Sequence, residues 1–163
     1  MKKTSAVRDN MGEIAIVKDG GVGAATSGPL ILIATGTRDI SDAAWKQLWE
    51  DIAKLRKKQG VLAAALVHAP KKHPTLAQQE LAQKQHAKTL GLPAGARSAV
   101  LFAKAKRAST ATKAATFWSS GEIELRCFPP DAADAALAWL KEKAAFDPAD
   151  AKTMLAKLAA AIN

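Results

Sequence analysis

The sequence predicts an α/β fold: a mainly parallel sheet of about five strands, an antiparallel strand at the N-terminus, helices packed on the sheet and an extra C-terminal helix. Three observations carry this prediction. Short runs of β-branched or apolar residues alternate with longer segments that repeat apolar residues at helical spacing. Strands separated by helices pair in parallel, through right-handed crossovers. The run 61–67 is apolar throughout, as is typical of a central strand covered on both faces.

The N-terminal part predicts two strands joined by a loop. Residues 13–18 are rich in β-branched side chains, and residues 30–35 form a second apolar run. Between them, 19–29 holds four glycines and a proline, which are typical of a flexible loop. We therefore expect the two strands to pair antiparallel. The loop has neither the Gly-Lys-Ser/Thr of a phosphate-binding loop nor a helix directly after it, so it is not interpreted as a nucleotide site.

The first helix has the clearest signals in the chain. Ser41 is a good N-cap, Ile40 is placed to pack against Trp45, and Gly60 is a C-terminal cap. One apolar face is formed by residues at helical spacing, namely Trp45, Leu48, Trp49, Ile52 and Leu55. Two tryptophans one turn apart are interpreted as core and not as a binding platform.

The second half of the chain continues the alternation of helices and strands. A helix is expected over 75–90, because Thr75 and Gln78 have the spacing of a capping box. Residues 122–128 alternate apolar and charged side chains, which indicates an edge strand with one solvated face. The other expected elements are a strand over 98–103, a helix over 108–119, a helix after Asp131 and a last helix opened by Asp147 and Pro148.

Length and composition predict one soluble domain. With 163 residues, we expect a flexible N-terminus over 1–11, the α/β domain over 12–142, and a helical extension over 143–163 packed on that domain. The longest apolar runs are far shorter than the roughly 20 residues that cross a bilayer. The single cysteine, Cys127, allows no internal disulfide and no cysteine-based metal cluster. These features favour the cytoplasm.

The net charge of +9 raises the question of an anionic partner. The 24 lysines and arginines are scattered along the chain, with no run longer than the three residues Arg56, Lys57 and Lys58, so nucleic acid is the less favoured partner. His68, His73 and His86 have no helical i, i+4 pair and no adjacent carboxylate, so no metal site is expected. No cofactor is expected either.

One group of residues points to a binding surface. The carboxyl ends of neighbouring parallel strands meet at one edge of a sheet, where ligands gather. There the chain places Lys71, Lys72 and His73 before a helix start near Thr75, and Lys104, Lys106 and Arg107 before a helix start near Ser109 or Thr110. Cations beside positive helix ends are unfavourable unless an anion is present. This basic rim is interpreted as a site for an acidic protein, a phosphate-bearing ligand or a phosphorylated side chain; a merely solvated rim is the alternative.

The order of elements and several phrases resemble the STAS fold, specifically the SpoIIAA-like group related to anti-sigma-factor antagonists. The resemblance spans roughly residues 12–142. The phrases that carry it are Asp42-Ala43-Ala44-Trp45, the strand 61–67, Glu124-Leu125-Arg126-Cys127-Phe128, Pro129-Pro130-Asp131 and Ala135-Ala136-Leu137-Ala138-Trp139-Leu140.

The resemblance implies a non-enzymatic domain that regulates by protein–protein contact, and in some members the contact is switched by phosphorylation. The phosphoserine of the antagonists lies in an Asp-Ser-rich segment that corresponds to 69–75 here. This segment has no Asp-Ser pair, and only Thr75 offers a hydroxyl. We interpret Thr75 as a helix cap.

Three functional hypotheses stay open at this point. The first is a regulatory or scaffolding module that binds an unidentified cytosolic protein, as the family resemblance implies. The second is an anion-binding or nucleic-acid-binding protein that uses the basic rim, with salt-sensitive binding. The third is an enzyme of unknown reaction, which the lack of convergent acidic, histidine or cysteine residues at strand ends disfavours.

Overall fold

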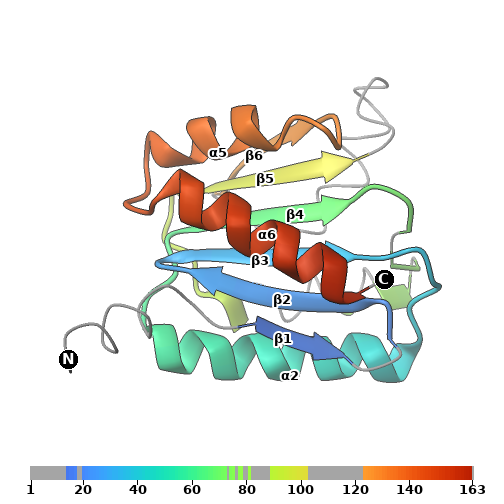
Figure 1. Ribbon diagram of the computed structural model, residues 1–163. Coiled ribbons are helices and arrows are strands. Elements are labelled where there is room, and N and C mark those ends of the chain that lie inside the picture. The colour runs from blue at the N-terminus through green and yellow to red at the C-terminus, as the bar shows by residue number, and fades with distance from the viewer. Residues whose placement is uncertain are drawn as a thin grey trace, which may run out of the picture.

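The protein is a mixed β-sheet with helices on both faces, as seen in a computed structural model (Figure 1). The structure describes residues 14–17, 20–72, 74–75, 77–78, 81, 89–102 and 123–162. The expected N-terminus over 1–11, the helix over 108–119 and most of the helix over 75–90 lie outside these residues. None of the helices within the described residues is long and apolar enough to cross a membrane.

Within the described residues, the sheet has six strands in sequential order. They are β1 (Ile14–Val17), β2 (Val22–Ser27), β3 (Leu30–Thr35), β4 (Ala64–Ala69), β5 (Arg97–Phe102) and β6 (Glu124–Phe128). The first three strands pair antiparallel, and β3 to β6 pair in parallel. The predicted α/β class is therefore confirmed, with a sheet that is parallel in its second part only.

Three helices are described over their full length. They are α2 (Asp42–Gln59), α5 (Ala133–Lys141) and α6 (Pro148–Ile162). The caps predicted for α2 are confirmed: the backbone N–H of Ala44 donates to the Ser41 hydroxyl at 3.1 Å, and Gly60 has a φ of 94°. Asp147 caps α6, because its carboxylate accepts from the Ala149 N–H at 2.9 Å.

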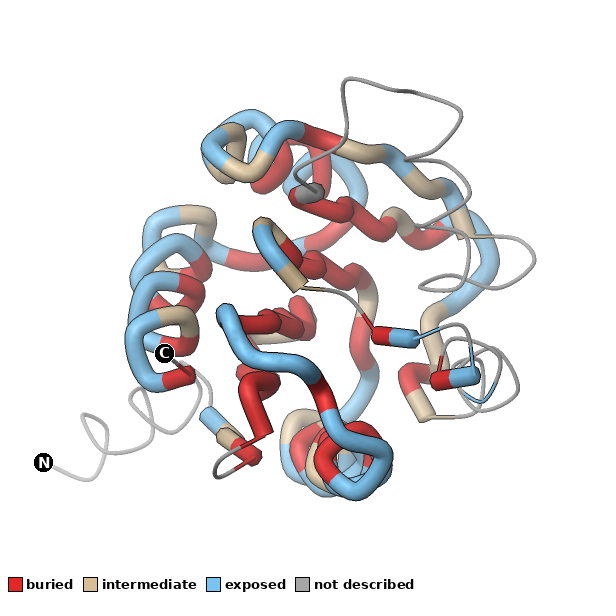
Figure 2. The backbone as a smooth tube through the Cα atoms, turned by 90° about the vertical axis from the view of Figure 1, so that its right-hand side faces the viewer, coloured by how far each residue is buried: buried red, intermediate tan, exposed pale blue. Residues whose placement is uncertain are grey.

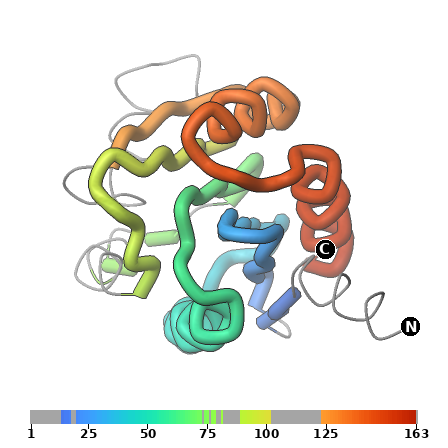
Figure 3. The backbone as a smooth tube through the Cα atoms, turned by 90° about the vertical axis from the view of Figure 1, so that its left-hand side faces the viewer, coloured from blue at the N-terminus to red at the C-terminus, as the bar shows by residue number. Residues whose placement is uncertain are grey.

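The glycine-rich segment is not a loop, and this corrects the sequence prediction. Six of its residues, Val22–Ser27, form β2, which pairs with β1 on one side and with β3 on the other. All six are buried, because α2 packs on one face of β2 and α6 on the other (Figure 3). Small side chains let both helices approach the strand closely. The strands 14–17 and 30–35 are consequently not neighbours.

The central strand also differs from its prediction. Residues 61–67 were expected to form it, but β4 runs from Ala64 to Ala69 and includes His68. Val61 is 75% exposed, because the chain must still cross from the end of α2 to the sheet. The Ala63 N–H then donates to the Pro29 carbonyl at 2.8 Å, and the strand begins.

Alternating side chains divide the core into two clusters, one on each face of the sheet. Figure 2 shows the buried residues along the strands and on the sides of the helices that face the sheet. On β3, Ile31 and Ile33 point toward α2, whereas Leu30 and Leu32 point toward α5 and α6. The last helix thus covers one face of the sheet, and Leu158 on it is completely buried. Both faces of the central strands are apolar because both are covered.

The polar face of the edge strand β6 makes more side-chain contacts than the sequence predicts. Its position at the end of the sheet and its alternation are confirmed. The face of Glu124 and Arg126 is not merely solvated, however, because Arg126 lies 5.0 Å above the Phe128 ring. Arg97 lies 4.6 Å above Trp139, donates to its carbonyl at 2.7 Å and pairs with Glu142. The contacts of Arg97 with Trp139 and Glu142 fasten α5 to the sheet.

Candidate functional site

The structure describes three residues of the basic rim. Lys71 is exposed, Lys72 is partly exposed, and Thr75 is exposed near the carboxyl end of β4. His73, Lys104, Lys106, Arg107 and Ser109 lie outside the described residues. The convergence of the two basic segments on one anion therefore stays a prediction.

Lys72 already has a carboxylate partner. Its ammonium lies 2.8 Å from Asp39, in the loop that joins β3 to α2. The hydrogen bond and charge of Lys72 lower the pKa of the Asp39 carboxyl below its ordinary value. The Thr35 hydroxyl donates to the Lys72 carbonyl at 2.7 Å and holds the same segment. An anion at this place would have to compete with Asp39 for Lys72.

Thr75 forms the capping box that its spacing predicts. The Gln78 N–H donates to the Thr75 hydroxyl at 3.2 Å, and the Thr75 N–H donates to the Gln78 side-chain oxygen at 3.0 Å. Two N–H groups at a helix start are satisfied in this way. The hydroxyl of Thr75 is therefore engaged in local structure.

Replacement of Thr75 by alanine is expected to lower the free energy of unfolding by about 1 kcal/mol, because an N-cap acceptor is lost. Urea unfolding followed by circular dichroism measures this, and Thr75→Ser, which keeps the hydroxyl, is the matched control. Unchanged stability of Thr75→Ala together with lost partner binding would contradict the role as a cap.

Gln78 has a larger part in the fold than the capping box predicts. It is 3% exposed, and its amide donates to the Ile40 carbonyl at 2.8 Å and to the Asp42 carboxylate at 2.9 Å. The indole N–H of Trp45 donates to the Gln78 carbonyl at 2.9 Å. These bonds join the segment after β4 to the first turn of α2. They link residues more than 30 positions apart, so the sequence alone gave no signal for them.

His68 is a titratable residue on β4, one of the inner strands of the sheet. It is partly buried on β4, and its Nδ1 has no hydrogen-bond partner within the described part of the chain. Burial lowers the pKa of His68 below its ordinary value of 6.5, and the Pro130 carbonyl opposes that shift.

Burial raises the pKa of the Cys127 thiol, which disfavours a reactive thiolate. Over the described residues, no three His, Cys, Asp or Glu side chains gather as metal ligands do.

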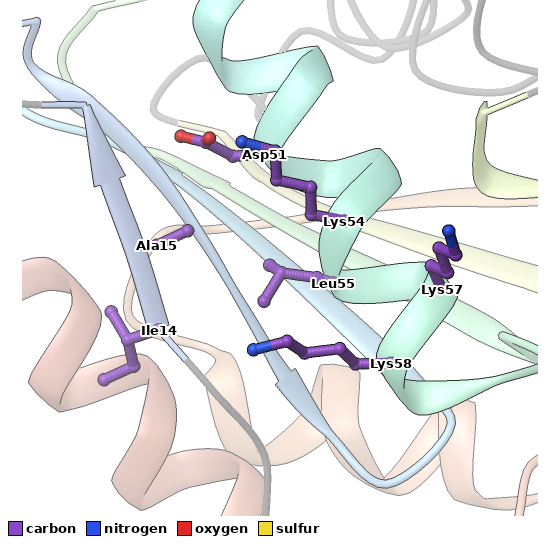
Figure 4. A pocket seen from close by; sticks show the side chains of 7 residues that line it. All are labelled: Ile14, Ala15, Asp51, Lys54, Leu55, Lys57 and Lys58. Atoms are coloured by element: carbon purple, nitrogen blue, oxygen red, sulfur yellow. The ribbon is translucent and has the colours of Figure 1, made fainter.

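A groove between β1 and the second half of α2 is the other candidate site (Figure 4). It has a cavity volume of about 320 Å³. Its lining combines apolar side chains with three lysines and one aspartate: Ile14, Ala15, Leu55, Lys54, Lys57, Lys58 and Asp51. At the sheet edge, Ile14 is 38% exposed. The groove therefore offers apolar surface and positive charge at one place.

The side chains of the groove divide into a floor and a wall. Figure 4 shows Leu55 pointing from α2 toward β1, with Lys54 and Lys58 reaching in the same direction on either side of it. The Asp51 carboxylate accepts from the Gln47 amide at 2.9 Å on the same helix. We call Ile14, Ala15 and Leu55 the floor, and Lys54 and Lys58 the lysine wall, whose charge exceeds that of Asp51. Lys57 borders the groove, but its side chain points away from β1 (Figure 4). The sequence shows these lysines on α2, but not that β1 lies beside them.

Comparison with known proteins gives no match: no protein-family model, no curated protein and no solved structure is significantly similar to the chain.

Proposed function

We propose that the chain is a non-enzymatic regulatory or scaffolding domain that acts by binding another protein, as its resemblance to the STAS and SpoIIAA-like families implies. The observation that carries the proposal is the groove between β1 and α2. It joins exposed apolar surface to a lysine wall, which is a combination that protein partners recognise: apolar contact gives affinity and charge gives orientation.

The strand-end surface supports the same proposal less strongly. Lys72 is paired with Asp39, and the Thr75 hydroxyl serves as a cap, so two of the rim residues have structural partners. Lys71 remains exposed there. Binding of a phosphate or nucleic acid at this rim is the alternative function, and the experiment below separates it from the first.

The test is photo-crosslinking in the cells that produce the protein. A photoreactive amino acid replaces Lys54 in the groove, Lys71 at the rim, or the exposed Lys157 on α6 as the matched control. We expect a defined adduct with one other protein from position 54 and not from position 157. Equal adducts from 54 and 157, or no protein adduct from 54, would overturn the proposal. Crosslinks to nucleic acid from position 71 alone would favour the alternative.

A further inference from the structure

We propose that the groove binds an acidic segment of a partner protein in extended conformation, and that this segment adds a strand to the edge of β1 that faces no other strand of the described sheet. The inference rests on the proposed function and names the kind of partner. The experiment is chosen so that this binding mode can fail while the crosslinks of the proposed function remain.

The first argument is the position of β1. Among the strands that the structure describes, β1 pairs with β2 and has no neighbour on its other side (Figure 1). Alternate residues of an edge strand direct their N–H and C=O groups outward, where they can pair with another chain. Recognition by strand addition uses such an edge for affinity and neighbouring pockets for specificity. The groove lies directly beside this edge, since Ile14 and Ala15 are part of its lining.

The second argument is the chemistry that an added strand would meet. Successive side chains of a strand point to opposite faces of the sheet. One set from the added strand would point toward α2, over Ala15 and Leu55 and between the side chains of the lysine wall. Apolar side chains fit the floor, and glutamate or aspartate fits the wall. An extended segment that mixes valine-like and acidic residues satisfies both.

The third argument is charge, which disfavours two other occupants. The segment 1–13 of this chain carries Lys2, Lys3 and Arg8 against Asp9 and Glu13, so it brings no net negative charge to the wall. A second copy of the chain carries a net charge of +9 and is repelled by the first. An acidic partner is attracted by the same field. Charge therefore selects a different protein over self-association.

The test uses a synthetic ten-residue peptide that alternates valine and glutamate. Its binding to the full chain is measured by fluorescence anisotropy, and amide hydrogen exchange is followed by NMR. We expect binding that weakens with salt and slower exchange of the outward-facing amides of β1. The double variant Lys54→Glu/Lys58→Glu is expected to weaken binding about tenfold, because two attractions become repulsions.

Three controls separate the contributions of the charge of the groove, the charge of the peptide and the hydrogen bonds of the peptide backbone. Lys46→Glu/Lys157→Glu makes the same change in net charge with exposed lysines outside the groove, and it should bind as the wild type does. A peptide with lysine in place of glutamate should not bind. A peptide that is N-methylated at alternate residues keeps its charges but cannot complete a strand ladder, so we expect it to bind more weakly.

Four results would overturn the inference. They are equal binding of the N-methylated peptide, protection confined to α2, binding that requires removal of residues 1–11, and protection of β1 by concentration-dependent self-association without peptide. The second result would point to a helical partner, the third to the chain's own N-terminal segment and the fourth to a second copy.

Discussion

Replacement of Trp45 by alanine is expected to lower the free energy of unfolding by about 4 kcal/mol. Trp45 is completely buried in the first turns of α2, and its ring packs edge-on against Trp49 at a centroid distance of 5.7 Å. Its indole N–H also donates to the Gln78 carbonyl. The alanine variant loses the packing, opens a cavity and leaves that carbonyl without its donor. Urea unfolding followed by circular dichroism measures the loss.

Trp45→Phe separates packing from hydrogen bonding. It keeps an aromatic ring but removes the N–H that reaches the Gln78 carbonyl. A loss of about 2 kcal/mol is expected, because a buried acceptor is left unsatisfied and some volume is lost. If Trp45→Phe were as stable as the wild type, the hydrogen bond from Trp45 to the Gln78 carbonyl would contribute nothing to stability.

The second large effect concerns the contact between α6 and β2. Leu158→Ala is expected to cost about 3 kcal/mol, because a completely buried leucine is truncated. Gly23→Ala is expected to cost about 2 kcal/mol in the wild type, because the strand is overpacked. A Cβ at Gly23 would lie 3.0 Å from Cδ1 of Leu158 and 3.0 Å from the Ala15 carbonyl oxygen.

The two changes should not be additive. In the Leu158→Ala background, the added methyl at position 23 meets no leucine, so its cost should fall by about 1 kcal/mol. The contact with the Ala15 carbonyl remains, so the cost does not vanish. Thermal or urea unfolding of the wild type, both single variants and the double variant gives the coupling. If the two changes in the free energy of unfolding were strictly additive, Leu158 on α6 would not limit the space available at position 23.

The sequence predicted elements whose signals are local. The helix α2 was predicted with its caps because Ser41, Gly60 and the apolar stripe lie within one segment. The capping box of Thr75 and Gln78 was predicted for the same reason. The strand β2 was missed, because glycine, alanine and serine favour loops unless two helices cover them. Burial between α2 and α6 reverses that preference, and neither helix lies near β2 in the sequence.

The candidate site was predictable only in part. The rim was placed by the rule on strand ends, and Lys71, Lys72 and Thr75 do follow β4. The partner of Lys72 was not predictable, since Asp39 lies 33 positions earlier in a loop after another strand. The groove was missed for a similar reason. The lysine wall and Leu55 come from α2, whereas Ile14 and Ala15 come from β1. The hairpin of β2 and β3 lies between these two elements in the sequence and places them side by side.

The sequential order of the strands has a consequence for synthesis on the ribosome. Each strand pairs with the one made just before it, so the sheet can grow in the order of translation. The helix α6 is the exception, because it is made last but covers β2 and β3, which are made early. Until α6 emerges, the apolar side chains of Leu30 and Leu32 on that face lack their final cover. Nascent chains that end before residue 148 should therefore depend most on chaperones.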